Sequence, residues 1–383
     1  MSVQIGRVKG VPIRLHFTLL IVFSLVTWSL AANFMPQFFP GLSSAEYWIM
    51  GVAGAILLFI SVLLHELSHS VLAMRFGIKV RQIMLFIFGG VSDIEEEPKN
   101  PQKEFQIAIA GPATSFVLSA IFAGLWAISA AINDVPVFEG IMLYGAIINA
   151  LLGAFNLLPA FPLDGGRVLR AVLVKRTKRD FDQATDTSVK VGIAISYVMM
   201  GLGFVTILTG NGFVSGIWLI LIGWFLQSGA QSYRYQHELT AILSKVRMRD
   251  IMNISFIAIP PETSLQESLQ RYFSVYMKSA FPVTDAAGRL LGMVTLKRVM
   301  DSSGDDESKR QVLTVREVMM PLEELNVVSP DTRGDEAVKK MTSSGIGKIF
   351  VCDLEGRLLG MVTKTDLLNV VSERQEYSKT VTR

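Results

Sequence analysis

Three long blocks without lysine or arginine constrain the fold of this chain more than any other feature of its sequence. Each block is long enough for two membrane-crossing helices of about 20 residues, and each contains a turn-forming stretch near its middle. We therefore expect an α-helical membrane protein with a bundle of six spans. The blocks cover residues 15–74, 104–166 and 191–233, and the expected spans are 15–32, 48–74, 105–131, 138–160, 190–209 and 213–231.

The basic residues of the membrane half lie before, between and after these blocks, and this sets the expected orientation. The positive-inside rule places these segments in the cytoplasm. We expect a multi-pass protein of the plasma membrane, surrounded by membrane lipid, with both termini cytoplasmic and an uncleaved first span. No basic patch is interleaved with aromatic residues, so nucleic acid is not an expected partner. The single cysteine, Cys352, excludes disulfides within one chain.

The second expected span carries a motif with metal-binding spacing, His65-Glu66-Leu67-Ser68-His69. On a helix, His65 and His69 share one face about one turn apart, so both rings can reach one metal ion. Glu66 can then act as a base, as in the H-E-x-x-H pattern of zinc proteases. Ionisable groups inside an apolar span cost about 2.5–3.5 kcal/mol each on insertion scales, which argues against a chance match. We expect one zinc ion per chain.

Asp164 is the expected third ligand. Pro159 and Pro162 must break the fourth span just before it, which places Asp164 near the depth of the two histidines. A catalytic zinc usually has three protein ligands. His16, at the start of the first span, and His237, after the last span, are less well placed.

Several residues near this end of the fourth span have two possible roles. Asp164 could instead cap a helix or pair with Arg167. Asn156 could donate a hydrogen bond to a substrate carbonyl or a developing oxyanion, or it could join two helices. The small residues of the third span, from Ala110 to Ser115, are expected to serve helix packing rather than chemistry.

Residues 80–94, between the second and third spans, are rich in β-branched and aromatic side chains, which predicts a short β-hairpin. Its edge, including Phe88, Gly89 and Gly90, could bind an extended substrate by strand addition. A re-entrant loop with only a structural role is the alternative. The glutamates at 95–97 are expected to form a solvated turn rather than to bind metal.

The chain after residue 235 has the charge of a soluble protein and contains an internal repeat. The segment 288–295 recurs unchanged at 356–363, and flanking segments correspond with a period of 67–68 residues. We expect a membrane domain over residues 1–235, two repeat domains over 246–300 and 312–375, and a polar, flexible linker over 301–311.

Together, the motifs of the membrane half resemble the site-2 protease family of intramembrane zinc metalloproteases. The resemblance implies a zinc ion held by His65, His69 and Asp164, with Glu66 as the base. It also implies cleavage of single-pass membrane proteins in or near their transmembrane segment. The matching segments are residues 10–16, 65–69, 88–90 and 109–112, and the run from Asn156 to Gly166.

The repeats resemble a tandem pair of cystathionine-β-synthase (CBS) domains, an α/β module. In that family a Gly-x-x-Thr-x-x-Asp pattern marks a nucleotide cleft, where the threonine faces phosphate and the aspartate binds ribose. The second repeat has this pattern with Thr363 and Asp366, whereas the first has Arg298 in place of the aspartate. The resemblance implies one regulatory site for ATP or AMP. A pair that binds nothing and only forms a homodimer is the alternative.

A CBS-regulated membrane ion transporter is the main rival hypothesis, because intramembrane histidine, aspartate and asparagine can line an ion path. The polar groups here cluster at one depth rather than along a route, which favours a reaction site. A noncatalytic relative that only binds membrane partners is a second rival, and the complete motif together with Asp164 argues against it.

Overall fold

The computed structural model describes residues 2–87, 89–95, 98, 100–132, 135–177, 180–210, 212–304 and 306–381, with side chains described up to residue 374. The chain divides into two compact units, Met1–Arg234 and Tyr235–Arg383. We call them the membrane unit and the CBS unit, and each is described by itself.

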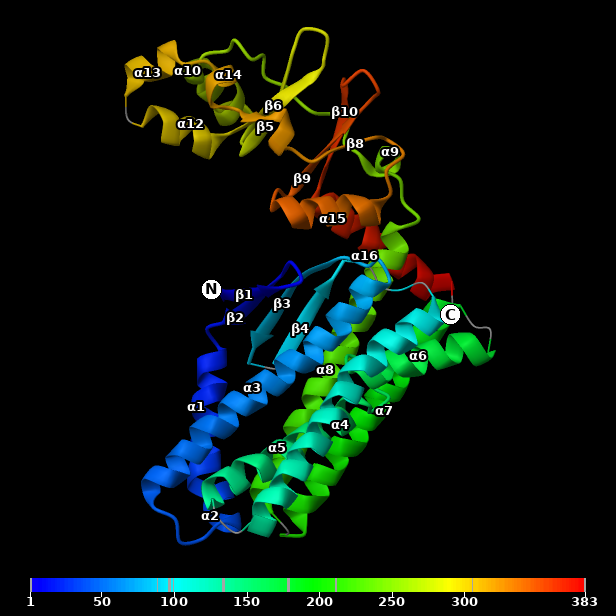
Figure 1. Cartoon of the computed structure of the whole chain (residues 1–383). Coiled ribbons are helices and arrows are strands. Elements are labelled where there is room, and N and C mark those ends of the chain that lie inside the picture. Colours follow the sequence, from blue (N-terminus) through cyan, green and yellow to red (C-terminus); the bar gives the residue numbers. More distant parts are fainter. Residues whose placement is uncertain are drawn as a thin grey trace. The chain divides into compact units, whose positions relative to one another are not determined.

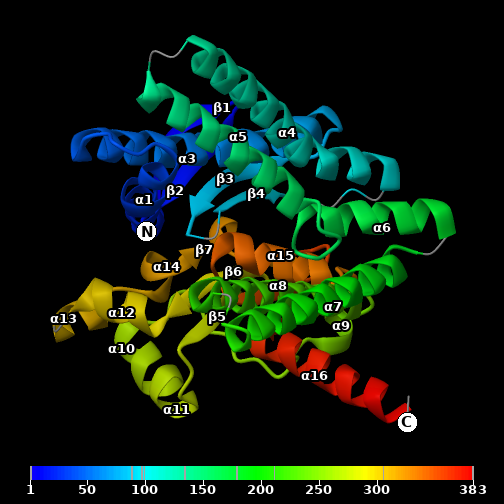
Figure 2. The same cartoon turned by 90° about the horizontal axis from the view of Figure 1, so that it is seen from below.

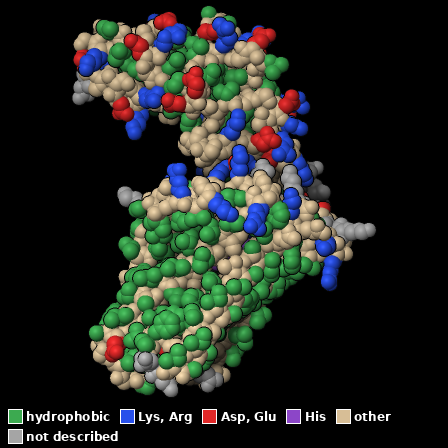
Figure 3. All heavy atoms as spheres, viewed as in Figure 1, with side chains coloured by type: hydrophobic (Ala, Val, Ile, Leu, Met, Phe, Trp, Pro, Cys, Tyr) green, Lys and Arg blue, Asp and Glu red, His purple; other side chains and the backbone are tan. Residues whose placement is uncertain are grey.

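In the described part of the chain, six helical segments of the membrane unit are long and apolar enough to cross a membrane, as expected from the sequence. Figure 1 shows most of them running side by side, and on the face shown in Figure 3 hydrophobic side chains cover the flank of this unit. The segments are Leu19–Phe38 (α1, Leu19–Ser29; the π-helix η1, Leu30–Phe34; α2, Met35–Phe38), α3 (Ser44–Arg75), α4 (Pro101–Ile132), α5 (Pro136–Asn156), α7 (Phe181–Leu208) and α8 (Phe213–Leu243).

The ends of these helices follow local signals. Helix α3 begins after Ser43, which forms a reciprocal cap with Glu46. Helix α5 ends at Asn156, a few residues earlier than expected, because the prolines that follow cannot continue it. A further helix, α6 (Asp164–Thr177), was not expected from the sequence. A Cβ atom on Gly165 would lie 2.2 Å from the carbonyl oxygen of Leu158, so glycine lets the preceding loop pack against the first turn of α6.

The membrane unit also contains a four-stranded sheet in the order β1-β2-β3-β4. The hairpin of β3 and β4 confirms the prediction for residues 80–94. Strands β1 and β2 were missed, although apolar and polar residues alternate from Ser2 to Ile5 in β1. In β2, Val11 and Ile13 are 3% and 5% exposed. Figures 1 and 2 show β3 and β4 beside α3. The strands are β1 (Ser2–Val8), β2 (Val11–His16), β3 (Val80–Phe86) and β4 (Gly89–Ile94), and only the β2–β3 pair is parallel.

The CBS unit contains two three-stranded sheets, ordered β5-β6-β7 and β10-β9-β8. The third strand of the first sheet, β7 (Met320–Pro321), comes from the second repeat. The repeats share a hydrophobic cluster that includes Leu290 and Leu358. The backbone N–H of Leu290 donates to the carbonyl oxygen of Gly356, and that of Leu358 donates to the carbonyl oxygen of Gly288, each at 3.0 Å. Cys352 lies in the same cluster, and burial raises the pKa of its thiol to about 11. The two repeats therefore form one module.

The elements of this unit follow the repeat. In the first repeat they are α9 (Met248–Ile251), α10 (Leu265–Ser268), η2 (Leu269–Phe273), α11 (Ser274–Tyr276), β5 (Ala280–Thr284), β6 (Leu290–Thr295) and α12 (Leu296–Ser303). The second comprises α13 (Glu307–Val312), α14 (Val315–Val318), β7 (Met320–Pro321), η3 (Leu322–Glu324), β8 (Val327–Val328), α15 (Gly334–Ser344), β9 (Lys348–Cys352), β10 (Leu358–Thr363) and α16 (Lys364–Val381).

The segment 301–311, expected as a flexible linker, is helical over most of its described residues. Helix α12 extends to Ser303, and α13 begins at Glu307. Asp306 caps α13 by accepting hydrogen bonds from the backbone N–H groups of Ser308 and Lys309. The polar composition that suggested a linker therefore includes a helix-capping signal that was overlooked.

Candidate metal centre

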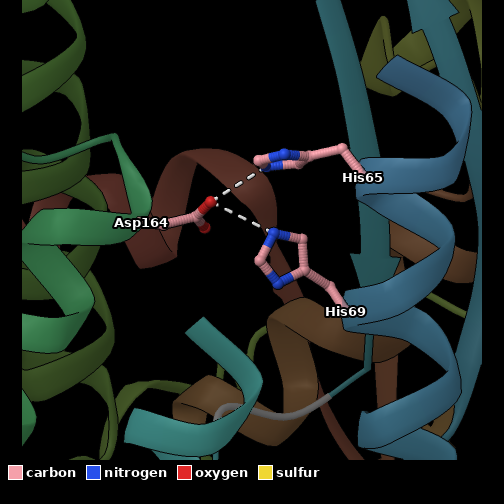
Figure 4. Close-up of side chains that lie close together, drawn as sticks. All are labelled: His65, His69 and Asp164. Carbon is pink, nitrogen blue, oxygen red and sulfur yellow. Dashed lines mark hydrogen bonds and ion pairs between the residues drawn. The ribbon is translucent and has the colours of Figure 1, made fainter. Parts of the chain in front are cut away.

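Three of the predicted site residues lie together although they are distant in the sequence. His65 and His69 project from α3, and Asp164 is the first residue of α6 (Figure 4). The Nε2 atoms of both histidines lie 3.1 Å from Oδ2 of Asp164. The histidines are 3% and 4% exposed, and one ligand atom from each of the three residues lies within 4.8 Å of the others. The helical spacing of the histidines and the position of Asp164 therefore agree with the geometry expected for a metal cluster.

The outer nitrogen of each ring is held by α4. His65 Nδ1 lies 2.9 Å from Oγ of Ser115, and His69 Nδ1 lies 2.6 Å from the carbonyl oxygen of Ile107. The carbonyl can only accept, so Nδ1 of His69 carries a proton. Groups of this kind orient metal-binding histidines and select their tautomer.

The tautomer of His69 shows whether its second ring nitrogen, Nε2, is able to bind a metal ion. When His69 is neutral and protonated at Nδ1, its Nε2 has a lone pair, and this lone pair faces the carboxylate oxygen of Asp164 at 3.1 Å. Two acceptors at this distance repel each other, and a cation between them removes the repulsion. Two imidazoles and one carboxylate are a donor set that zinc takes in catalytic sites. The residues therefore fit a zinc ion.

Gly111 provides the space for this cluster. A Cβ atom on Gly111 would lie 2.1 Å from Nε2 of His69 and 2.5 Å from Nε2 of His65. The assignment of the small residues of α4 to packing alone was therefore incomplete, because Gly111 and Ser115 also contact the histidines. One signal for this was available, since Ile107, Gly111 and Ser115 recur every four residues on one helix face.

Glu66 is held between α3 and strand β4. Its Oε2 lies 2.8 Å from Oγ of Ser92, and a Cβ atom on Gly90 would lie 2.4 Å from its Cγ. Gly90, predicted to contact substrate, thus makes room for the predicted base. Gly89 has a φ of +121°, which favours glycine at this turn. Phe88, the other residue predicted at this edge, lies outside the described residues.

The two asparagines of α5 lie in different surroundings. Asn156 donates from Nδ2 to the carbonyl oxygen of Leu152 in its own helix at 2.9 Å. Asn149 is 0% exposed and donates from Nδ2 to Oγ of Ser61 on α3 at 3.0 Å. Asn149, rather than Asn156, is therefore the residue whose side chain joins two helices.

A buried ion pair connects α4 and α6 beyond the metal cluster. Arg170 is 1% exposed and pairs with Glu104, which is 0% exposed. Its guanidinium also donates to Tyr233 OH at 2.6 Å and to Thr185 Oγ1 at 3.2 Å, and it lies over the Phe161 ring at 5.2 Å. This network was not expected from the sequence, because nothing local marks Arg170 as different from the neighbouring basic residues.

In the CBS unit, the predicted nucleotide residues contact each other. Oδ2 of Asp366 accepts from Oγ1 and the backbone N–H of Thr363 at 2.7 and 2.8 Å, which forms a reciprocal cap at the start of α16. In the first repeat Thr295 caps α12 by accepting from the backbone N–H of Arg298 at 3.2 Å. The return bond is missing there, because the side chain of Arg298 cannot accept a hydrogen bond. Thr363 and Asp366 of the second repeat therefore have a structural role at this helix end.

Comparisons with known proteins cover both units. The sequence profile of Peptidase family M50 matches residues 53–140 and 129–199, and that of the CBS domain matches residues 248–305 and 315–373. Among solved structures, the site-2 protease from Methanocaldococcus jannaschii is 32% identical, covers 61% of this chain and 95% of that chain, and has a TM-score of 0.41.

Two similar proteins extend over nearly the whole chain. Rip3 of Mycobacterium tuberculosis, provisionally named a zinc metalloprotease, is 32% identical over 97% of this chain and 93% of that protein. The zinc metalloprotease MJ0392 of Methanocaldococcus jannaschii is 31% identical over 97% of this chain and 96% of that protein. This likeness over full length, together with both domain matches, shows that the chain belongs to peptidase family M50, the site-2 protease type of zinc metalloprotease, and has tandem CBS domains.

Proposed function

We propose that this metalloprotease cleaves a peptide bond in or near the transmembrane segment of single-pass membrane proteins, with His65, His69 and Asp164 as zinc ligands and Glu66 as the base. The observation that carries the proposal is the convergence of two histidine nitrogens and one carboxylate oxygen within 4.8 Å. The ion-transporter alternative is not favoured, because relatives that match the whole chain are named as zinc metalloproteases.

The roles of the residues follow from their chemistry. Zinc at this cluster would supply a Lewis acid that polarises a carbonyl and acidifies water. Glu66 then takes a proton from the attacking water and delivers it to the leaving nitrogen. Asn156, which donates within α5, would have to turn before it could bind a substrate carbonyl or an oxyanion.

The substrate must be extended near the cluster, because the carbonyl groups of an intact helix are bonded internally. Strand β4 is an edge of the sheet, and Gly89 and Gly90 offer little steric hindrance there. We propose that an unwound substrate segment adds to this edge. Helix-favouring substitutions at the cut site of a model single-pass segment should then slow its cleavage. Unchanged rates in such a series would contradict the unwinding requirement.

Metal content tests the ligand set without a substrate. We expect about one zinc per chain in the detergent-purified wild type, and a large loss in His65→Ala and Asp164→Ala. Glu66→Gln is the matched control, because it should retain zinc and lose proteolysis. A folded wild type without zinc, under conditions that do not strip metal, would overturn the proposed ligand set and move the transporter and partner-binding alternatives ahead.

We also propose that ATP or AMP binds to the CBS unit at Thr363 and Asp366 and regulates proteolysis. The support is the presence of the bonded Thr363–Asp366 pair in the second repeat, together with its absence from the first, where Arg298 occupies the equivalent place. Nucleotide should raise the unfolding temperature of the wild type and change its rate of proteolysis, and Asp366→Ala should abolish both effects. If ATP and AMP leave both quantities unchanged, a CBS pair that only forms a homodimer becomes the better account.

The location proposed is the plasma membrane, with both termini in the cytoplasm. On the face shown in Figure 3, Lys and Arg side chains gather at one end of the membrane unit, as the positive-inside rule requires. An accessible C-terminal tag in intact cells without permeabilisation would contradict this orientation.

A further inference from the structure

Strand β4 presents one face to the metal-binding motif on α3. Side chains alternate along a strand, so Gly90 and Ser92 share a face, while Val91 between them is 50% exposed. A Cβ atom on Gly90 would clash with Cγ of Glu66, so only glycine fits there. Ser92 Oγ lies 2.8 Å from Oε2 of Glu66. Gly90 and Ser92, two neighbouring positions on this face of β4, therefore both contact the predicted base.

A short chain of hydroxyl groups ends at the Glu66 carboxylate. Ser70, which is 0% exposed, donates from Oγ to Oγ of Ser92 at 3.1 Å. Ser92 lies within bonding distance of two acceptors of Glu66, Oε2 at 2.8 Å and the backbone carbonyl oxygen at 3.2 Å. An ionised carboxylate only accepts, so the Ser92 hydroxyl is the donor, and its bond to a charged acceptor is the stronger one.

These contacts hold one carboxylate oxygen and leave the other available. Among the residues that the structure describes, no group donates a hydrogen bond to Oε1 of Glu66. A glutamate side chain without such contacts samples many rotamers, whereas a general base must lie within hydrogen-bonding reach of the proton that it takes. A hydroxyl on a strand, which is more rigid than a loop, can supply this constraint.

We propose that Ser92 is a positioning residue whose hydroxyl holds the Glu66 carboxylate in the orientation that proton transfer requires. This inference rests on the proposed role of Glu66 as the base. Strand β4 is also the edge to which we expect the substrate to add. Ser92 therefore connects the strand that receives the substrate to the group that activates water.

Removal of the hydroxyl should slow the chemical step and leave metal and substrate binding unchanged. We expect Ser92→Ala to lower kcat about 10-fold or more, with KM and zinc content within about twofold of wild type. Ser92→Thr retains the hydroxyl and should recover most of kcat. Ser119→Ala is the matched control, because it removes a hydroxyl that bonds to the Ala146 carbonyl oxygen away from the cluster.

The rates are measured with zinc-loaded full-length protein in detergent micelles. The probe is a quenched fluorogenic transmembrane peptide that carries a helix-breaking Asn-Pro pair at its cytoplasmic end. A second measurement needs no substrate. The infrared difference between wild type and Glu66→Gln isolates the carboxylate band of Glu66, and this band should shift in Ser92→Ala but not in Ser119→Ala.

The outcomes separate this inference from the proposed function. Cleavage retained by Glu66→Gln would remove the base assignment and the inference with it. An inactive Glu66→Gln together with wild-type kcat and an unshifted carboxylate band in Ser92→Ala would overturn the positioning role alone. Loss of zinc in Ser92→Ala, or no recovery of kcat and of the band in Ser92→Thr, would also overturn it, because the serine would then be structural.

Discussion

One arginine–carboxylate pair from each unit of the molecule shows a large difference in burial. Arg170 and Glu104 of the membrane unit are 1% and 0% exposed, whereas Arg316 and Glu262 of the CBS unit are 51% and 71% exposed. The large buried side chains of the CBS unit are apolar, such as Phe281 at 1% exposure.

The difference follows from the solvent around each unit. Lipid is as apolar as leucine, so hydrophobic packing does not tell the helices of a membrane bundle which faces should meet. Buried polar groups can select the faces that meet, and the membrane unit has such groups between its helices, such as Arg170 and Glu104. In water, hydrophobic burial drives the packing and charges stay at the surface. The same substitution should therefore have a large effect in one unit and a small effect in the other.

The largest effect is expected for Arg170→Met. It removes the guanidinium that pairs with the buried Glu104 carboxylate, and the loss of one partner of a buried pair costs about 3–5 kcal/mol of unfolding free energy in comparable proteins. The measurement is unfolding by SDS in detergent micelles, followed by tryptophan fluorescence, because all five tryptophans lie within residues 28–224. The double variant Arg170→Met, Glu104→Leu removes both charges and should regain most of the loss. If the double variant is no more stable than the single one, the pair is not the reason for the loss.

The next largest effect is expected at Gly111, where the metal cluster leaves no space for a side chain. In Gly111→Ala, the new methyl group must displace at least one histidine ring from its position. We expect zinc affinity, measured by competition with a chelator, to fall about 10- to 100-fold, as when the supporting groups of a metal site are lost. Gly124→Ala on the same helix is the control, since nothing lies within 4 Å of that Cβ position. Equal affinities in the two variants would contradict the proposed cluster.

A smaller effect is expected within the CBS unit, where the repeats differ at one helix end. Met277 has a φ of +50° after α11, and Gly345 has a φ of +71° after α15. A left-handed conformation costs a side chain about 1 kcal/mol. Met277→Gly should therefore stabilise the CBS unit by about 1 kcal/mol and Gly345→Ala should destabilise it by a similar amount. Hydrogen exchange of CBS peptides in increasing urea measures both changes, and shifts of the same sign would be inconsistent with this backbone explanation.

The smallest effect is expected for Arg316→Met, which removes one partner of the exposed pair in the CBS unit. The exposed pair with Glu262 is screened by water, so the free energy of unfolding should change by less than about 0.5 kcal/mol. The same exchange experiment measures it, with and without added salt. A loss comparable with that of Arg170→Met would show that burial is not what separates the two pairs.

Much of the architecture could be predicted from local patterns. The six spans, the hairpin at 80–94 and the CBS repeats all follow from hydropathy, β-propensity and repetition. Strands β1 and β2 had such a signal and were missed, as was the capping signal of Asp306 in the expected linker. Helix α6 could not be inferred in the same way, because its Gly165 and Gly166 are poor helix formers that the preceding loop requires.

At the metal cluster, the candidate ligands follow from local sequence patterns, because helical spacing brings His65 and His69 to one face and two prolines end the helix before Asp164. The groups that surround these ligands depend on how distant helices and strands pack together. The Ile107 carbonyl, Gly111 and Ser92 are brought to the site by the rotation of α4 and the register of β4. The spacing of Ile107, Gly111 and Ser115 marks one face of α4, but it does not show which neighbouring element that face meets, because apolar helices in lipid can pack through several faces.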